Sequence, residues 1–472
     1  MFTLILLIYF VSFLDKPEKT APQLSPRAVE QRAKWHIKTD QMDYPVSAMY
    51  MDSLRRMGVK IHHKSRWFNG VTCEMDKKTA EKVAGLKFVT DVEMTRDDSA
   101  PIYAPRKRVR ELGISELGIR DLGKSDTYKQ LATYNLLPLH KAGFEGQGIL
   151  MAICDGAFYN AQTLPCFRQK ELDLGYFDFT DDGDDFYGST GAHGTYCLST
   201  ISGISDSSYY GAATKAQYYL MRSEEEKTES PKEMDNLVAA LEKADSLGVN
   251  VFSVSLGYAL FDNDDWTLQK SELDGQSTRA SRAATIAARK GMLVCVAAGN
   301  EGNSDWKTIS VPADADSILT VGAVSVDSLI GNFSSWGPSA DGRIKPDVCA
   351  VGVHATLINP SGIIMPAGNG TSFATPLLAG LAACLWSALP NENAMQIRDR
   401  IIRSADRYMN PDTNQYGYGI PDAWKAYTMT PTGVEGVTDD RLRVTGQKIL
   451  RNGQLYLMYE GRMYDVLGRE IE

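Results

Sequence analysis

The sequence lacks several features that would each indicate a specific class of protein. It has no Cys-x-x-Cys pair among its 7 cysteines, so neither a zinc knuckle nor a dense disulfide framework is indicated. It has no excess of basic residues, because 59 Asp and Glu outnumber 50 Lys and Arg and give a net charge of -9. This balance does not favour a nucleic acid or an anionic membrane as partner.

A long hydrophobic run is also missing. The N-terminal run MFTLILLIYFVSFL ends at Asp15 and is too short to cross a bilayer as a helix. It resembles the apolar part of an export signal, although no Lys or Arg precedes it and no clear cleavage site follows. We favour an export signal, with residues 1–8 as its remnant. The alternative is that part of the run is a core strand.

The cysteines are scattered and odd in number. Three of them, Cys154, Cys295 and Cys384, lie inside apolar runs and are expected to be small core residues. The sequence allows one disulfide but does not identify which cysteines would form it.

Residues 9–95 have the pattern of a small α/β domain. YFVSFLD and VTCEM are predicted strands, and three segments with helical periodicity are LSPRAVEQRAKWHI, SAMYMDSLRRMGV and TAEKVAGL. Residues 96–125 then lose this periodicity and contain two prolines and clustered charge, which predicts a linker.

From 126 to 428 short apolar runs alternate with helical segments. The runs are apolar throughout, which is typical of strands buried on both faces of a parallel sheet: GILMAICD, AQYYLMRS, VNVFSVSLG, GMLVCVAAGN and SILTVGAVS. The segments between them supply the crossover helices. We therefore predict a doubly wound, mostly parallel α/β domain with its ligands beyond the carboxyl ends of the strands.

The segment 433–472 is predicted to be a separate β-rich tail. Asn452-Gly453 and Glu460-Gly461 are hairpin turn signals between β-rich runs, so we expect a three-stranded meander.

Three polar residues fall where this sheet should carry its site. Asp155 ends an apolar strand, His193 lies in GAHGTY before a helical run, and Ser372 lies in GNGTSFATP at a helix start. Serine is a weak nucleophile alone, and it needs a histidine base that a buried carboxylate orients. Asn300, just past another buried strand, has an amide that can donate to a developing oxyanion.

Each of these residues also has an ordinary structural interpretation. His193 is one of only 6 histidines and could be a surface or core residue, Asp155 and Ser372 could be caps, and Asn300 could be a turn residue. Their joint placement at strand ends and helix starts of one α/β domain argues against coincidence.

The segments ICDGAFYN, GAHGTYCLSTISG, VFSVSLG, VAAGNEG, FSSWGP and NGTSFATPLLAG resemble the subtilisin-like serine proteases, in that family's order. The resemblance implies that Asp155 orients His193, that His193 is general base and then acid, that Ser372 is the nucleophile and that Asn300 is an oxyanion donor. It further implies that Ser255, Leu256 and Gly257 form one wall of the peptide groove. The floor of the S1 pocket would lie near 310–313, with a medium-sized, uncharged character.

Residues 9–95 resemble the propeptide of a Bacteroidetes-type branch of this family. The resemblance implies a folding chaperone and inhibitor that is cleaved off within 96–125. The tail is similar to short β-rich C-terminal segments of proteins exported by the same bacteria.

The predicted protein is an exported serine endopeptidase, either secreted or at the cell surface or in the periplasm. Its predicted partners are a peptide or protein substrate and its own propeptide, with no nucleic acid and no membrane span. No cofactor is expected for catalysis. Structural calcium is common in the family but has no assigned position, and DFTDDGDDF at 178–186 lacks the EF-hand spacing and is predicted to be a solvated loop.

Two alternative functions remain open from the sequence. One is a catalytically silent binding or chaperone module on the same scaffold. The other is a transpeptidase that excludes water from the acyl-enzyme, which the mass of the product would reveal.

Overall fold

The computed structural model describes residues 7–18, 20–97, 126–167, 170–180, 183–188, 191–205, 208–225 and 228–430, together with four strands between 447 and 471. Residues 1–427 form one compact unit and 428–472 a second. Most of the predicted linker 96–125 and both predicted tail turns lie outside the described residues.

A seven-stranded sheet forms the centre of the first unit, and every neighbouring pair in it is parallel. Its spatial order is β13 (Val348–Val351), β12 (Leu319–Val324), β11 (Leu293–Ala297), β10 (Val251–Val254), β5 (Leu150–Asp155), β9 (Gln217–Arg222) and β6 (Asp173–Asp178). The five predicted strands are confirmed. They are almost entirely buried, which explains why they are apolar throughout.

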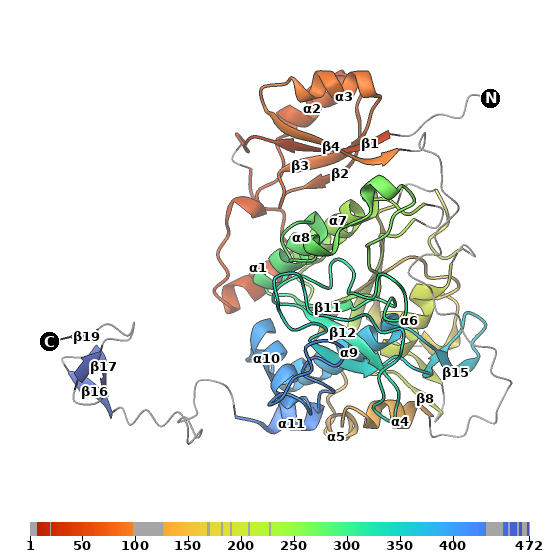
Figure 1. Ribbon diagram of the computed structural model, residues 1–472, viewed down its shortest axis with the longest axis vertical. Helices are drawn as coiled ribbons and strands as arrows, with labels where there is room; N and C mark the ends of the chain where they lie inside the picture. Colours follow the sequence, from red (N-terminus) through yellow and green to blue (C-terminus); the bar gives the residue numbers. More distant parts are fainter. Residues whose placement is uncertain are drawn as a thin grey trace. The chain divides into compact units, whose positions relative to one another are not determined.

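Helices cover both faces of this sheet, as predicted for a doubly wound fold (Figure 1). One face packs on α6 (His193–Ser202) and α9 (Thr371–Ala388), and the other packs on α7 (Lys232–Leu247) and α8 (Arg279–Arg289). Further helices in this domain are α4 (Asp126–Ala132), α5 (Leu137–Lys141), α10 (Ala394–Ser404) and α11 (Ala423–Thr428). Two small hairpins pair β7 (Ile204–Ser205) with β8 (Tyr209–Tyr210) and β14 (Ala355–Ile358) with β15 (Ile364–Gly368).

The sheet places the predicted polar residues along one edge. Asp155 ends β5, Ser255 follows β10 and Asn300 follows β11, and these three strands are neighbours in the sheet. Because neighbouring parallel strands end at the same edge, these side chains are gathered there.

The N-terminal domain is a four-stranded antiparallel sheet in the order β2 (Lys60–Ser65), β3 (Gly70–Glu74), β1 (Leu7–Phe13) and β4 (Val89–Asp97). Helices α2 (Ala48–Arg56) and α3 (Lys77–Ala84) cover one face, and the other faces α7 and α8 (Figure 1). Helix α1 (Pro26–Lys34) reaches the end of α7, where the Ser25 hydroxyl donates to the Leu247 carbonyl. The apolar run near the N-terminus is therefore a buried strand from Leu7 onward.

The second unit contains β16 (Gln447–Arg451), β17 (Gln454–Tyr459), β18 (Arg462–Tyr464) and β19 (Glu470–Ile471) in consecutive antiparallel order. The prediction of three strands was wrong by one. The additional strand, β19, has only two residues, which is too short for a periodic pattern to identify.

All seven cysteines are buried and free, so the open question of a disulfide is answered. Cys154, Cys295 and Cys384 are fully buried core residues, as expected from their apolar surroundings. Among the described residues, α9 is the one helix long and apolar enough to cross a membrane, and 83% of it is buried inside the protein.

Candidate active site

Asp155 and His193 form a hydrogen-bonded pair at the carboxyl edge of the central sheet. Asp155 is fully buried at the end of β5, and His193 is the first residue of α6. Oδ1 of Asp155 lies 2.7 Å from Nδ1 of His193 and also accepts from the N–H of Gly156 at 2.8 Å. With Nδ1 facing the carboxylate, Nε2 lies on the side of the ring away from it.

The electrostatics of this pair favour a proton on the imidazole. Burial alone would lower the pKa of His193, but the charge of Asp155 and the contact with Cys197 raise it well above its usual 6.5. A histidine with a raised pKa is a stronger base, which suits it to take a proton from a hydroxyl group and hold it.

Ser372 is the second residue of α9 and is 9% exposed. Ser372 and His193 share a neighbour. The Cys197 thiol lies 3.3 Å from the Ser372 carbonyl and 3.8 Å from His193 Nδ1. The ring of Phe373 packs against the His193 ring with centroids 5.7 Å apart. The structure thus brings together two residues that are far apart in the sequence.

Asn300 lies beside the start of α9. Its Oδ1 accepts hydrogen bonds from the N–H of Thr371 at 2.8 Å and from the Thr371 hydroxyl at 2.9 Å. These two bonds fix the plane of the amide and therefore the direction of its Nδ2 donors. Within the described part of the chain, the N–H of Ser372 in this first helical turn has no acceptor.

The segment Ser255–Gly257 extends β10 toward this site. Ser255 contacts Ser372 directly, since its hydroxyl donates to the Ser372 carbonyl at 2.9 Å. Gly257 passes so close to Ser310 that an added Cβ would lie 2.9 Å from the Cβ of Ser310. A side chain at 257 would collide there, and the predicted S1 floor near 310–313 thus packs against the predicted groove wall.

Sequence reasoning missed two contacts in this site. The first contact is between Cys197 and His193. They are four residues apart on α6, and this i, i+4 spacing could have predicted that their side chains meet. The second contact is at Thr371, whose hydroxyl donates to Asn300 and also accepts from the N–H of Gly299 at 3.2 Å. No local pattern predicts the bond between Gly299 and Thr371, because these residues are 72 positions apart.

The segment 178–186 was predicted to be a solvated loop, but its described residues make specific contacts. Asp178 accepts from the N–H and hydroxyl of Thr180 and lies 3.4 Å from buried Arg222. Phe186 is buried and stacks on Phe158 with centroids 5.3 Å apart. The loop is therefore anchored to the domain at its described ends.

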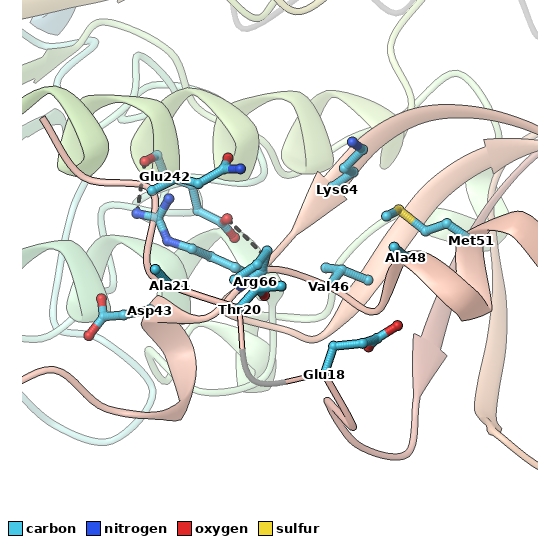
Figure 2. A pocket seen from close by; sticks show the side chains of 12 residues that line it. Glu18, Thr20, Ala21, Asp43, Val46, Ala48, Met51, Lys64, Arg66 and Glu242 are labelled. Carbon is cyan, nitrogen blue, oxygen red and sulfur yellow. Dashed lines mark hydrogen bonds between the residues drawn. The ribbon is translucent and has the colours of Figure 1, made fainter.

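Buried ion pairs hold the N-terminal domain on α7. Arg66 reaches Asp245 at 2.5 Å, and Arg32 reaches the same carboxylate at 2.8 Å. Glu242 accepts from the backbone N–H groups of Arg66 at 2.9 Å and Trp67 at 3.1 Å. Figure 2 shows Arg66 and Glu242 meeting at a pocket of about 450 Å³ between the two domains.

Comparison with known proteins agrees with this geometry. Residues 146–419 match the Subtilase family, and residues 8–110 match the peptidase S8 propeptide domain of Bacteroidota. The chain is 28% identical to serine protease AprX of Bacillus subtilis over 308 residues, which are 59% of this chain and 66% of AprX. It is 26% identical to subtilisin E of the same species over 377 residues, covering 79% of this chain and 84% of subtilisin E.

Among solved structures, MycP1 from Mycobacterium smegmatis has a similar fold, with a TM-score of 0.51 and 21% identity over 64% of this chain and 84% of that chain. The parallel sheet, the two covering helix layers and the matched segments agree with one another. The chain belongs to the subtilase family of serine endopeptidases and carries an N-terminal S8 propeptide domain.

Proposed function

We propose that this protein hydrolyses peptide bonds through an acyl-enzyme on Ser372, with His193 as general base and then acid and Asp155 as the residue that orients it. The observation that carries the proposal is the Asp155–His193 hydrogen bond at 2.7 Å beside the Cys197 thiol that also touches Ser372. Asp155 fixes the tautomer in which Nε2 is the base and stabilises the imidazolium as it forms.

The oxyanion of the tetrahedral intermediate would accept from the Asn300 amide and the N–H of Ser372. Thr371 supports this role because it holds the Asn300 amide by its oxygen. The N-terminus of α9 adds a favourable dipole at the same point. Donors fixed before reaction need no reorganisation in the transition state, which is why such sites contribute strongly to rate.

The substrate would lie as an extended strand along Ser255, Leu256 and Gly257. Backbone groups at the end of β10 can pair with an added strand, which gives affinity without regard to side chains. The S1 pocket would have Ser310 at its floor, because Ser310 packs between Gly257 and Gly299. Besides the substrate and the water that hydrolyses the acyl-enzyme, the proposed reaction uses only side chains and backbone groups of this chain. Structural calcium is common in the family and has no assigned site here.

The N-terminal domain would inhibit the enzyme until cleavage within 96–125, after which the peptidase domain 126–428 acts outside the cell. The buried ion pairs to Asp245 support a tight complex before cleavage. Residues 433–472 would then be a separate C-terminal segment.

The test compares wild type, Ser372→Ala and Ser199→Ala by intact mass and N-terminal sequencing, and treats each purified protein with a fluorophosphonate. Ser199 is a matched control because it lies on the helix of His193, yet its hydroxyl donates to the Tyr196 carbonyl at 2.7 Å. We expect wild type and Ser199→Ala to begin within 96–125 and to be labelled. We expect Ser372→Ala to keep its N-terminal domain and to remain unlabelled. Labelling of Ser372→Ala would overturn the proposal.

A further inference from the structure

The backbone carbonyl of Ser372 lacks its usual helical donor. In an α-helix a carbonyl accepts from the N–H four residues further along. For Ser372 on α9 that residue is Pro376, which has no N–H and whose ring crowds the carbonyl four residues before it. Every residue of α9 from Thr371 to Trp386 is buried, so this carbonyl is removed from bulk water. Because a buried carbonyl without a donor is costly, the missing bond has to be replaced from outside the helix.

Two side chains from other elements supply donors to this carbonyl. The Ser255 hydroxyl, just after β10, donates to it at 2.9 Å, and the Cys197 thiol on α6 donates to it at 3.3 Å. Both residues are buried. Burial, together with the charge of Asp155, raises the pKa of the Cys197 thiol to about 11, so the thiol keeps its proton at neutral pH and can donate. The carbonyl of Ser372 is therefore held by β10 and by α6.

The bond from Cys197 has a particular consequence because α6 also carries His193. His193 is the first residue of α6, and Cys197 lies one helical turn later with its sulfur 3.8 Å from His193 Nδ1. This bond thus joins the helix of the proposed base directly to the residue of the proposed nucleophile. Proton transfer between the two side chains depends steeply on their separation, and a shift of about 1 Å can cost 10²-fold in rate.

From these observations we propose that Cys197 is a positioning residue of this enzyme. Its thiol replaces the backbone donor that Pro376 removes, and it thereby holds Ser372 at the distance from His193 that proton transfer needs. The inference rests on the proposed function of Ser372 and His193. Cys197 acts through the Ser372 carbonyl and through no contact with the substrate. With an N–H at position 376, α9 could hold this carbonyl by itself, and the bond from α6 would lose its importance.

The experiment is a double-mutant cycle on the processed enzyme. It compares wild type, Cys197→Ala, Pro376→Ala and Cys197→Ala/Pro376→Ala in the hydrolysis of one internally quenched peptide. The kcat values are expressed per active site titrated with a fluorophosphonate, so that unfolded protein does not enter them. Pro376→Ala returns an N–H to the helix, and the cycle therefore separates the hydrogen bond of Cys197 from its packing.

We expect Cys197→Ala to lower kcat by about three- to tenfold, the range of one net hydrogen bond, and to change KM by less than about twofold. In the Pro376→Ala background the same substitution should lower kcat by less than about twofold. Cys197→Ser keeps a donor and should lose less activity than Cys197→Ala. Cys384→Ala is the matched control, because Cys384 is also fully buried and its thiol donates to the Ala212 carbonyl at 3.0 Å. It should keep the wild-type kcat.

Three results would overturn the role of Cys197. They are an unchanged kcat in Cys197→Ala, an equal fall in kcat with and without Pro376→Ala, and a Cys197→Ser enzyme as slow as Cys197→Ala. The second result would reduce Cys197 to a packing residue. Each of them leaves the proposed function intact, since wild type still cleaves the peptide. Failure of wild type to cleave it would count against the proposed function itself.

A second measurement covers variants that do not mature. Unprocessed Ser372→Ala keeps the backbone carbonyl at position 372 and needs no activity to be studied. In this background we expect Cys197→Ala to lower the midpoint of urea unfolding more when Pro376 is present than when Pro376→Ala is added. Equal shifts of the midpoint in the two cases would show that the thiol does not replace the helical donor, and would overturn the proposal.

Discussion

Ser255 and Ser372 exchange two hydrogen bonds. The Ser255 hydroxyl donates to the Ser372 carbonyl at 2.9 Å, and the Ser372 hydroxyl donates to the Ser255 carbonyl at 3.2 Å. The serine at the start of α9 is therefore fastened to the end of β10, which is the proposed groove wall. In this arrangement the Ser372 hydroxyl donates to a backbone carbonyl, so under the proposed mechanism it would rotate to donate to His193 when substrate binds.

Replacing Ser255 with alanine tests the first of these bonds. Ser255→Ala removes one donor from a buried carbonyl that keeps its contact with the Cys197 thiol. We expect a loss of unfolding free energy of about 1 kcal/mol and a several-fold fall in kcat. Urea unfolding of the unprocessed chain and peptide hydrolysis by the processed enzyme measure the two effects. Unchanged values of both would show that this bond does not position α9.

Substitutions of Asn300 separate its two hydrogen-bonding roles. Asn300→Asp keeps the oxygen that accepts from Thr371 but loses the amide donor, whereas Asn300→Ala loses both. We expect each to lower kcat by about 10²–10³, the range known for the corresponding residue of subtilisin, with little change in KM. Asn300→Ala should also reduce unfolding free energy by about 1–3 kcal/mol, because a buried N–H loses its acceptor. A fall in kcat with Asn300→Ala alone would assign the residue a structural role only.

The pH dependence of hydrolysis should report His193. Only the neutral imidazole accepts a proton, so kcat/KM is low below the pKa of His193 and rises as the pH passes it. Because this pKa lies well above 6.5, the midpoint of the rise should too. Asp155→Asn removes the charge that raises the pKa, and the midpoint should move down. Its kcat should fall by about 10⁴. The same midpoint in both enzymes would contradict the assignment.

Asp43 links the N-terminal domain to α8. Its carboxylate binds Lys290 at 2.8 Å and Arg32 at 2.7 Å and is almost fully buried. Burial alone would raise the pKa of Asp43, but these cations and a backbone N–H lower it below its usual 3.8. A lowered carboxylate pKa adds stability above the unfolded-state value, and that stability is lost as the pH falls through the folded-state value. Contact between the domains should therefore weaken below about pH 4.

Asp43→Asn should lower the unfolding free energy of unprocessed Ser372→Ala by about 3–5 kcal/mol at neutral pH, because two buried cations lose a partner. Urea unfolding monitored by tryptophan fluorescence measures this change. Asp52→Asn is the control in the same domain, since its pair with Arg55 is exposed, and little change is expected. Equal changes in unfolding free energy for the two variants would show that the ion pairs of Asp43 do not stabilise the protein.

Gly194 tests how tightly the histidine is held. A Cβ at this position would lie 2.6 Å from the Ala157 carbonyl oxygen and 2.7 Å from the Phe158 ring. Gly194→Ala must push α6 away, which should cost about 1–3 kcal/mol and lengthen the Asp155–His193 contact. We expect a fall in kcat with Ser372 still present. Gly85→Ala, whose Cβ would make only ordinary contacts, should change neither stability nor rate.

Strands buried on both faces could be predicted from the sequence, because their composition is uniform. β6 was missed since it lies at the edge of the sheet and alternates between exposed and half-buried residues. β13 was also missed: like β10 it has only four residues, but it directly follows the polar segment DGRIKPD. The position of Asp155 at the end of β5 could be anticipated from the cost of placing a carboxylate after an apolar run, whereas Ser255 was singled out only by the resemblance to the subtilisin-like proteases.

Contacts between distant segments could not be predicted. The exchange of bonds between Ser255 and Ser372 joins residues 117 positions apart, and the pairing of Arg96 with Glu225 spans 129. Such contacts depend on how the whole chain packs, and neither residue type nor spacing encodes them locally.

Helix α1 gives the N-terminal domain a second point of attachment. Arg27 on α1 binds the side chain of Asn250, which precedes β10, while the four-stranded sheet covers α7 and α8. A fragment held at two separate places dissociates only when both contacts are open at the same time. While one contact stays closed, it keeps the other at a high effective concentration, so that an opened contact re-forms quickly. Cutting the linker would therefore not start hydrolysis at once. The delay between the cut and full activity would be set by the rate at which the N-terminal domain dissociates from the peptidase domain.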